Sequence, residues 1–286
     1  MGEEIFGFIG LGNMGRPMAR NIREKGHALI VHDIGGTAER APDGAKIAQS
    51  NLEVARRAGV IALSLPTVEA NRAVIQEIAE AGHAGGVVVD SCTIGTDAAA
   101  ENARILEAAG IAYLDSPVSG LKFRAEEGTL ASMVAGPEAA VERARPLIEG
   151  YSRVLYHVGT SAGQGQRMKV VNNALFISSL VTTSEALAYG EHGGLDLETM
   201  LEVINGSSGQ NFLTTQVLPK YLAGGDWGAE AQIIQKDLGL FVEGTKAEGA
   251  PNAAIARAYD VITAFAEADP VQDLGRFYDF VRNKEN

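Results

Sequence analysis

The sequence predicts an α/β fold in which a Rossmann-type doubly wound parallel sheet is followed by an all-helical C-terminal domain. Two observations support this prediction. Over the first half of the chain, short runs rich in Val, Ile, Leu and Phe alternate with Ala-rich amphipathic stretches. After about Gly163 this alternation stops, and a long apolar segment opens a region of helical periodicity with no clear strand. Strands and helices alternating at this spacing are typical of a parallel sheet covered on both faces.

The predicted strands are apolar runs bounded by Gly, Asp or Pro: Ile5–Ile9, Ala28–His32, Val60–Leu65, Val87–Asp90, Ile111–Asp115, Ser132–Ala135 and Val154–His157. Amphipathic stretches at Asn13–Lys25 and Thr67–Ala81 are predicted to be helices between them. Gln164–Tyr189 is apolar on most sides, which is typical of a helix buried in protein. We therefore expect two domains, residues 1–162 and 163–286, with one long helix opening the second.

Composition narrows the classes of function. The 286 residues are 46% hydrophobic and 21% charged, as in ordinary globular proteins. The net charge is 24 − 36 = −12, and an acidic chain with no basic run is a poor binder of nucleic acid or anionic membranes. The single cysteine, Cys92, excludes an internal disulfide, and the histidines show no metal-ligand spacing, so we expect no metal site. With no recognisable signal peptide or membrane span, we expect a cytoplasmic protein.

A glycine-rich motif lies between the first predicted strand and the first predicted helix: Gly10, Leu11, Gly12, Asn13, Met14 and Gly15. In a G-x-G-x-x-G motif the first Gly permits a tight turn, the second lets a pyrophosphate approach the backbone, and the third lets the helix pack on the strand. Taken alone, the motif could be a structural turn. Here the strand, the helix and a later acidic residue accompany it, so the pattern predicts a dinucleotide site.

The acidic residue is Asp33, which follows the second predicted strand 33 − 15 = 18 residues after the last glycine. A carboxylate at this position hydrogen-bonds the adenosine ribose hydroxyls and repels a 2′-phosphate, so we expect NAD in preference to NADP. Arg40 is a nearby cation that could tolerate a phosphate, which keeps NADP open as the alternative cofactor.

Lys169 stands in an otherwise apolar segment, and Asn173 follows four residues later on the same helical face. Burying a lysine is costly unless the ammonium is paired or its pKa falls. A lysine with a lowered pKa can exchange a proton near neutral pH, and an amide beside it can hold a hydroxyl or carbonyl group. From the spacing alone, an ordinary lysine on a partly solvated edge is the alternative.

Four segments, in this order, resemble the β-hydroxyacid dehydrogenases, a family that includes 3-hydroxyisobutyrate dehydrogenase and tartronate semialdehyde reductase and is related to 6-phosphogluconate dehydrogenase. They are GFIGLGNMGRPMARNI from Gly7, DSPVSGLKFRAEEGTLASMVAG from Asp115, GQGQRMKVVNNAL from Gly163 and IQKDLGLF from Ile234. The resemblance extends from Ile5 to about Phe241. Four ordered motifs are far more specific than the glycine-rich motif alone.

The resemblance implies an NAD(P)-dependent 3-hydroxyacid dehydrogenase or reductase that forms homodimers or homotetramers. Lys169 would be the general acid in carbonyl reduction and the general base in alcohol oxidation, and Asn173 would orient the substrate. The remaining implied site residues are Ser119, Gly120 and Leu121 for the substrate, and Leu65, Pro66, Thr93 and Lys236 for the cofactor.

The chain departs from the family in the substrate segment, where Leu121 and Arg124 stand at positions that are usually glycine. We expect Leu121 to narrow or reshape the carboxylate pocket, which leaves the substrate more open than the reaction. The expected substrate is a short 3-hydroxy acid, and the alternative is a small semialdehyde such as succinic semialdehyde, glyoxylate or tartronate semialdehyde. Two further alternatives are a non-catalytic cofactor-binding scaffold and an imine reductase, and the presence of Lys169 argues against both.

Overall fold

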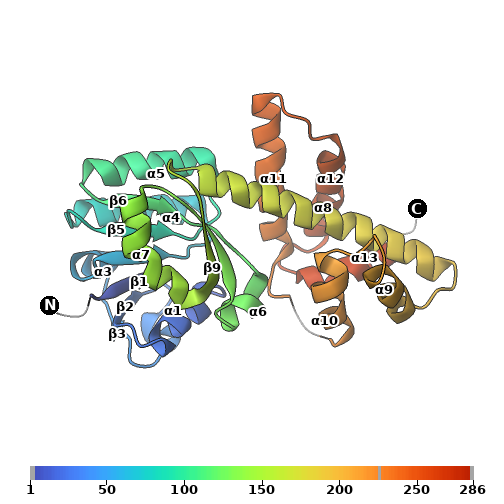
Figure 1. The fold of residues 1–286 in the computed structure, drawn as a ribbon, viewed down its shortest axis with the longest axis horizontal. Coiled ribbons are helices and arrows are strands. Elements are labelled where there is room, and N and C mark those ends of the chain that lie inside the picture. The colour runs from blue at the N-terminus through green and yellow to red at the C-terminus, as the bar shows by residue number, and fades with distance from the viewer. Residues whose placement is uncertain (1–3, 225–226, 284–286) are drawn as a thin grey trace. The chain divides into compact units, whose positions relative to one another are not determined.

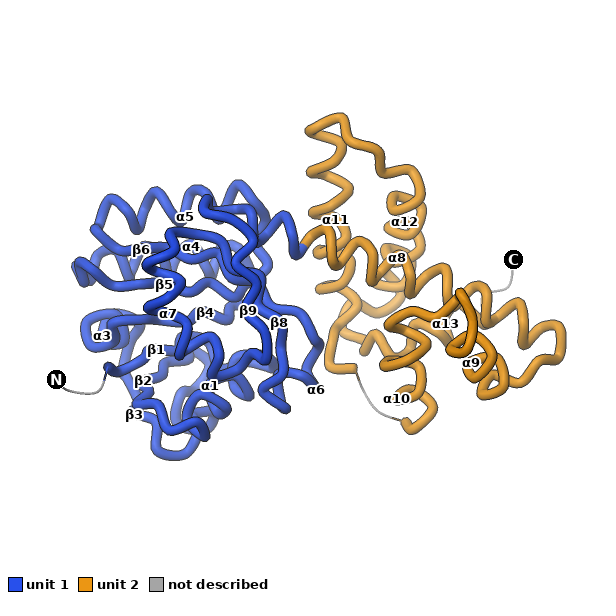
Figure 2. The backbone as a smooth tube through the Cα atoms, in the orientation of Figure 1, with its two compact units in different colours: residues 1–169 blue, residues 170–286 orange. Residues whose placement is uncertain are grey.

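The computed structural model describes residues 4–224 and 227–283 (Figure 1). It divides into two compact units, residues 1–169 and 170–286 (Figure 2). The division falls inside the long helix α8 (Gln164–His192). The boundary that the sequence predicts, after residue 162, lies just before the start of this helix.

Unit 1 contains a nine-stranded sheet of order β3-β2-β1-β4-β5-β6-β8-β7, with β9 paired to β8. The strands are β1 Phe6–Ile9, β2 Leu29–His32, β3 Lys46–Ile47, β4 Val60–Leu63, β5 Val87–Asp90, β6 Ala112–Asp115, β7 Val118–Ser119, β8 Leu130–Ala135 and β9 Ser152–Gly159. Neighbouring strands pair in parallel along the part of the sheet with the order β3-β2-β1-β4-β5-β6, which confirms the predicted sheet. Strand β8 runs antiparallel to β6 and β7. Strand β1 pairs with both β2 and β4, so the strand order reverses there. Ligands of doubly wound sheets bind at such a switch point, outside the carboxyl ends of the strands.

Both faces of the sheet are covered by helices, which explains why the central strands are continuous apolar runs. In β1, Phe6 and Phe8 enter one apolar core while Ile9 enters the other. Helices α1 and α7 contribute to the first core, and α3, α4 and α5 to the second. The helices of unit 1 are α1 Gly15–Glu24, α2 Thr37–Arg40, α3 Asn51–Arg57, α4 Val68–Glu80, α5 Thr96–Ala108, α6 Leu121–Glu126 and α7 Glu138–Tyr151.

Unit 2 contains most of α8, together with α9 Leu197–Asn205, the π-helix η1 Leu213–Val217, α10 Leu218–Leu222, α11 Ala231–Glu248, α12 Ala253–Ala268, η2 Leu274–Arg276 and α13 Phe277–Arg282. These helices share an apolar core that includes Ile177 of α8, Leu238 of α11 and Phe265 of α12. Among the described residues of unit 2, the extended pairing is limited to one isolated bridge between Glu230 and Asp273. The predicted helical C-terminal domain is therefore confirmed.

None of the described helices combines the length and the hydropathy needed to cross a membrane.

Candidate active site

The glycine-rich loop between β1 and α1 has the geometry that a dinucleotide requires. Gly10 has φ +93°, and a Cβ on it would lie 2.2 Å from the carbonyl oxygen of Ser64. A Cβ on Gly15 would lie 1.9 Å from the carbonyl oxygen of Gly10, so this residue must be glycine for α1 to pack on β1. A Cβ on Gly12 would meet nothing within 4 Å. The fold thus requires the first and third glycines, while the second borders open space where a ligand can approach.

Helix α1 is suited to binding an anion at its N-terminus. Its N-cap residue, Met14, provides no side-chain hydrogen bond to the first turn. The first N–H groups of a helix have no partner within the helix, and together with the helix dipole they favour a phosphate at this end.

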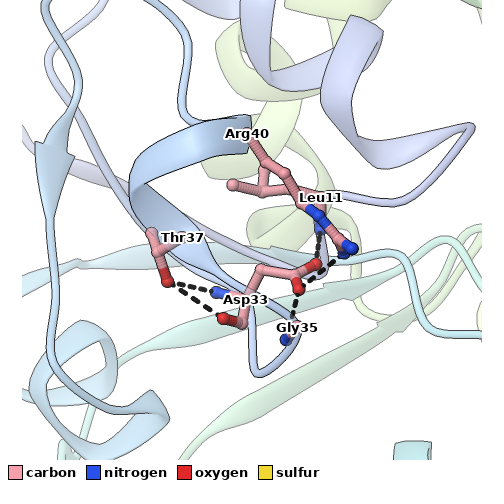
Figure 3. A network of polar contacts seen from close by, with 5 residues as sticks. All are labelled: Leu11, Asp33, Gly35, Thr37 and Arg40. Carbon is pink, nitrogen blue, oxygen red and sulfur yellow. Dashed lines mark hydrogen bonds and ion pairs between the residues drawn. The ribbon is translucent and has the colours of Figure 1, made fainter.

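Asp33 links the end of β2 to the glycine-rich loop (Figure 3). Its Oδ2 accepts a hydrogen bond from the N–H of Leu11 at 2.5 Å, and its Oδ1 accepts from the N–H of Gly35 at 2.7 Å. Arg40 Nη1 lies 2.9 Å from the same Oδ1, which makes an ion pair at a partly exposed position. The Thr37 hydroxyl bonds both the N–H and the carbonyl oxygen of Asp33. The carboxylate is held beside the loop, and its remaining lone pairs can accept ribose hydroxyls.

The segments that follow β4, β5 and β6 carry the other predicted residues of unit 1. Leu65 and Pro66 come directly after β4, Thr93 comes three residues after β5, and Ser119 lies in β7 after β6. The N–H of Leu65 donates to Cys92 Sγ at 3.1 Å, so the segments after β4 and β5 touch. Because carboxyl ends of parallel strands share one edge of a sheet, these segments follow the same edge as the glycine-rich loop.

The substrate segment keeps a glycine-like backbone at position 121, although Leu121 replaces the usual glycine there. Gly120 has φ +145°, and a Cβ on it would lie 2.8 Å from Arg124 Cβ. Leu121 has φ +60°, and among the described residues it is the one non-glycine residue with a positive φ. A left-handed backbone costs a residue with a side chain roughly 1–2 kcal/mol. Leu121 therefore adopts the conformation that glycine favours, and it places a half-buried apolar side chain next to Ser119 and Gly120.

Lys169 and Asn173 lie one turn apart on α8, and both are buried, with 9% and 6% of their surface exposed. In unit 2, Asn173 Nδ2 donates to Asp237 Oδ2 at 2.8 Å, and Lys236 Nζ lies 2.9 Å from Asp237 Oδ1. The structure thus brings Asn173 and Lys236 together through a buried aspartate of α11. No role for Asp237 was predicted, and its place beside Lys236 in the segment IQKDLGLF was the available signal.

Two further carboxylates lie buried where β5 and β6 end. Burial raises the pKa of Asp90, which accepts hydrogen bonds from Asn71, Tyr113 and the N–H of Cys92. Burial also raises the pKa of Asp115 to about 6. Burial, together with the negative charge of Asp90, raises the pKa of the Cys92 thiol well above its usual value. Cys92 packs in the core, and its burial and raised pKa both disfavour the thiolate that a nucleophile needs.

Both halves of the chain match known family models. Residues 5–159 match the NAD binding domain of 6-phosphogluconate dehydrogenase, and residues 163–275 match the NAD-binding domain of NADP-dependent 3-hydroxyisobutyrate dehydrogenase. The 2-(hydroxymethyl)glutarate dehydrogenase of Eubacterium barkeri is 34% identical over 277 residues, which cover 94% of this chain and 90% of that protein. The NAD-dependent L-serine dehydrogenase of Pseudomonas aeruginosa is 35% identical over 260 residues, which cover 84% and 85%.

Solved structures agree with these matches. The 3-hydroxyisobutyrate dehydrogenase of Mycobacterium tuberculosis, solved with L-serine, superposes with a TM-score of 0.85 at 29% identity and covers 98% of this chain and 100% of that chain. Together with the glycine-rich loop and Asp33, these relatives define an oxidoreductase that uses a nicotinamide dinucleotide. The chain belongs to the β-hydroxyacid dehydrogenase family. It acts on a small hydroxy acid, and its cofactor is NAD, with NADP as the alternative.

Proposed function

We propose that the protein oxidises a short 3-hydroxy acid of the form HOCH2–CH(R)–COO⁻ to the corresponding semialdehyde, and catalyses the reverse reduction. The names of three relatives support this form: 3-hydroxyisobutyrate, L-serine and 2-(hydroxymethyl)glutarate share this unit and differ only in R. The group R is a methyl group, an ammonium group and a carboxyethyl group, respectively. The substrate segment, with its unusual Leu121, would select among them.

In this proposal Lys169 moves the proton of the substrate hydroxyl, and this assignment rests on one observation. Lys169 and Asn173 are buried one turn apart on the same helix face. Burying an ammonium group costs free energy unless it is paired, so a lysine kept in such a place beside an oriented amide is a candidate functional residue. Lys169 would accept the hydroxyl proton in oxidation and return it in reduction. When bound, NAD supplies the hydride acceptor.

The other residues would hold the two reactants in place. Ser119 and the backbone of Gly120 would bind the substrate carboxylate, while Asn173, whose amide is oriented by Asp237, would bind the reacting oxygen. Leu65, Pro66, Thr93 and Lys236 would line the cofactor. Fixing both reactants removes the entropic cost of bringing them together, which is a large part of the barrier.

We also propose that the protein is a homodimer or homotetramer in the cytoplasm. On α8, the apolar side chains of Val171, Leu175 and Tyr189 share one face and are exposed in the single chain. A second copy of the chain would cover this face, because exposed apolar stripes of this kind mark contact surfaces. The free, buried thiol of Cys92 is consistent with a reducing compartment. Light scattering of the purified protein tests the oligomeric state.

Replacing Lys169 tests the proposed mechanism. Lys169→Ala should lower kcat by roughly 10²- to 10⁴-fold, the usual contribution of a positioned acid or base. NAD should still bind, as measured by calorimetric titration, because the glycine-rich loop and Asp33 are unchanged. Lys169→Arg should not restore activity, since a guanidinium keeps the charge but hardly releases a proton.

Lys46→Ala, at an exposed lysine of β3, is the matched control and should keep the wild-type kcat. If Lys169→Arg retains most of the wild-type kcat, the lysine acts only as a charge and the acid–base role is wrong.

A further inference from the structure

The first turn of α8 carries a fully buried glutamine whose amide group is completely used within unit 1. Gln166 Oε1 accepts hydrogen bonds from the N–H groups of Ile94 and Gly95, at 2.9 and 3.2 Å. Its Nε2 donates to the carbonyl oxygen of Cys92 at 2.9 Å and to Asp115 Oδ1 at 2.8 Å. A side-chain amide has two N–H donors and one oxygen with two lone pairs. All four are engaged, so this side chain has one orientation and no hydrogen bond to give to a ligand.

Asp115, at the end of β6, caps the N-terminus of the same helix. Its Oδ2 accepts hydrogen bonds from the N–H of Gly163 at 2.9 Å and the N–H of Gln166 at 3.0 Å. A Cβ on Gly165 would lie 2.6 Å from the Met133 carbonyl oxygen and 2.8 Å from that of Asp115. The first turn of α8 therefore lies directly against the sheet, at a distance that only glycine permits.

We infer that Gln166 and Asp115 are positioning residues that hold Lys169 and Thr93 in one fixed arrangement. Lys169 follows Gln166 by three residues in the same helix, so the place of the first turn sets the place of the lysine. The Cys92 carbonyl oxygen and the Ile94 N–H, which Gln166 binds, lie on either side of Thr93. One side chain thus ties the helix of the proposed proton-transfer group to the loop of a proposed cofactor residue. The inference rests on the proposed function, in which Lys169 moves the proton.

Gln166→Met tests this role, because methionine has a similar length but makes none of the four hydrogen bonds. We expect kcat to fall by roughly 10- to 100-fold, since a displacement of about 1 Å of a reacting group has a cost of this size. The Kd for NAD, measured by calorimetric titration, should rise by no more than about threefold, because Thr93 is one of several proposed cofactor contacts and the glycine-rich loop is unchanged. Gln164→Met is the matched control, since Gln164 lies in the same turn but is exposed and accepts its hydrogen bond from Ser161.

Gln166→Glu is the second variant, and it keeps the protein testable if the methionine variant folds poorly. One glutamate oxygen can still accept from Ile94 and Gly95, and the other then faces Asp115 Oδ1 and the Cys92 carbonyl oxygen. When this second oxygen is protonated it donates one hydrogen bond, to Asp115 or to the Cys92 carbonyl oxygen, in place of the amide's two, and when it is ionised it repels Asp115. We expect kcat relative to wild type to rise at least about tenfold from pH 8 to pH 6, whereas the ratio for Gln166→Met should stay flat.

Asp115 is the titratable group that contacts the side chain of residue 166. Asp90 acts on Asp115 through its charge, and Tyr113 and Cys92 contact Asp90. Lys169 lies on the same helix as residue 166. Taking the ratio to wild type at each pH removes their common contribution.

The outcomes separate this inference from the function on which it rests. If Gln166→Met keeps kcat within about twofold of wild type and changes only the melting temperature, Gln166 is merely structural and the inference is wrong. A loss of NAD affinity as large as the loss of kcat would also overturn it, because the main role would then lie in the cofactor site. The inference would also be wrong if kcat of Gln166→Glu relative to wild type did not change between pH 8 and pH 6. If Lys169→Ala, assayed in parallel, keeps its kcat, the proposed function fails, whatever Gln166 does.

Discussion

Asp33 and Asp115 are two carboxylates with nearly the same set of partners and different surroundings. Each accepts hydrogen bonds from two backbone N–H groups and one side-chain N–H group. The side-chain partner of Asp33 is the partly exposed cation of Arg40 (Figure 3), whereas that of Asp115 is the neutral, buried amide of Gln166.

The comparison shows that the number and kind of hydrogen-bond donors do not by themselves determine the role of a carboxylate. The Asp33 side chain is itself only 8% exposed, but its partner Arg40 is 40% exposed and Gly35 is exposed, so the ion pair lies at the protein surface and a cation offsets the carboxylate charge. Asp115 is sealed between a sheet and a helix, and burial raises its pKa to about 6. The first arrangement suits ligand recognition, and the second suits holding two elements together.

The largest expected difference between the two concerns stability. Asp115→Ala should lower the free energy of unfolding by about 3–4 kcal/mol, because it leaves three N–H donors without an acceptor in a buried place. Asp33→Ala should cost less, about 1–2 kcal/mol, because water can reach the exposed Gly35 N–H and Arg40 and only the Leu11 N–H is left without an acceptor in a buried place. Urea unfolding of both variants at pH 7 measures this, and equal losses would contradict the distinction.

The pH dependence of stability tests the buried carboxylate directly. The pKa of Asp115 rises from 3.8 to about 6 on folding, so between these values the folded state holds a proton that the unfolded state releases. Its contribution is therefore most favourable below pH 3.8, falls as the pH rises to about 6, and is constant above that, a loss of about 3 kcal/mol. The unfolding free energy of wild type minus that of Asp115→Asn, measured from pH 4 to 7, should fall by most of this amount, about 2–2.5 kcal/mol. A constant difference would mean that burial does not raise this pKa.

The segment that follows Asp115 contains Leu121, which we propose contacts the substrate and not the cofactor. Leu121→Gly should change the ratios of kcat/KM among acids that differ in R by roughly 10- to 200-fold, or ~1–3 kcal/mol. The Kd for NAD should not change. The backbone is already in the conformation that glycine prefers, so the variant should fold as well as wild type. Unchanged ratios across the panel would place Leu121 outside the substrate pocket.

The smallest expected effect concerns Asp33 and its ion-pair partner Arg40. NAD should be preferred to NADP, and Arg40→Ala should lower kcat/KM with NADP by about tenfold, because the guanidinium offsets the charge of Asp33 and can pair with a 2′-phosphate. Asp33→Ala should shift the preference toward NADP. Kinetics with both cofactors decide this, and a higher kcat/KM with NADP in the wild type would contradict the role of Asp33.

Much of the fold could be predicted because the central strands are buried on both faces. The predicted bounds of β5 (Val87–Asp90) match the observed ones, because a run of three valines that begins after a glycine pair is typical of a buried strand. The two-residue strands β3 (Lys46–Ile47) and β7 (Val118–Ser119) were not predicted. Two residues show no periodicity, and β3 is exposed at the edge of the sheet.

The candidate site divides in the same way. The glycine-rich loop and Asp33 form a local motif, whereas the apolar residues near Lys169 favoured its burial but left a partly solvated edge as the alternative. The contacts of Gln166 and Asp237 could not be predicted, because their bonds to Asp115 and Asn173 join residues 51 and 64 positions apart. Nothing in the local sequence distinguishes Gln166 from its polar neighbours Gln164 and Arg167.

The open space at Gly12 means that the three glycines of the loop are subject to different kinds of selection. A side chain at position 10 or 15 collides with the backbone of the chain itself, so such variants would be removed by the cell's quality control before any metabolite mattered. A side chain at position 12 meets nothing in the protein, and its harm would come from blocking the pyrophosphate. A mutational scan read out by protein abundance would therefore pass over Gly12, while one read out by growth on the substrate would detect it.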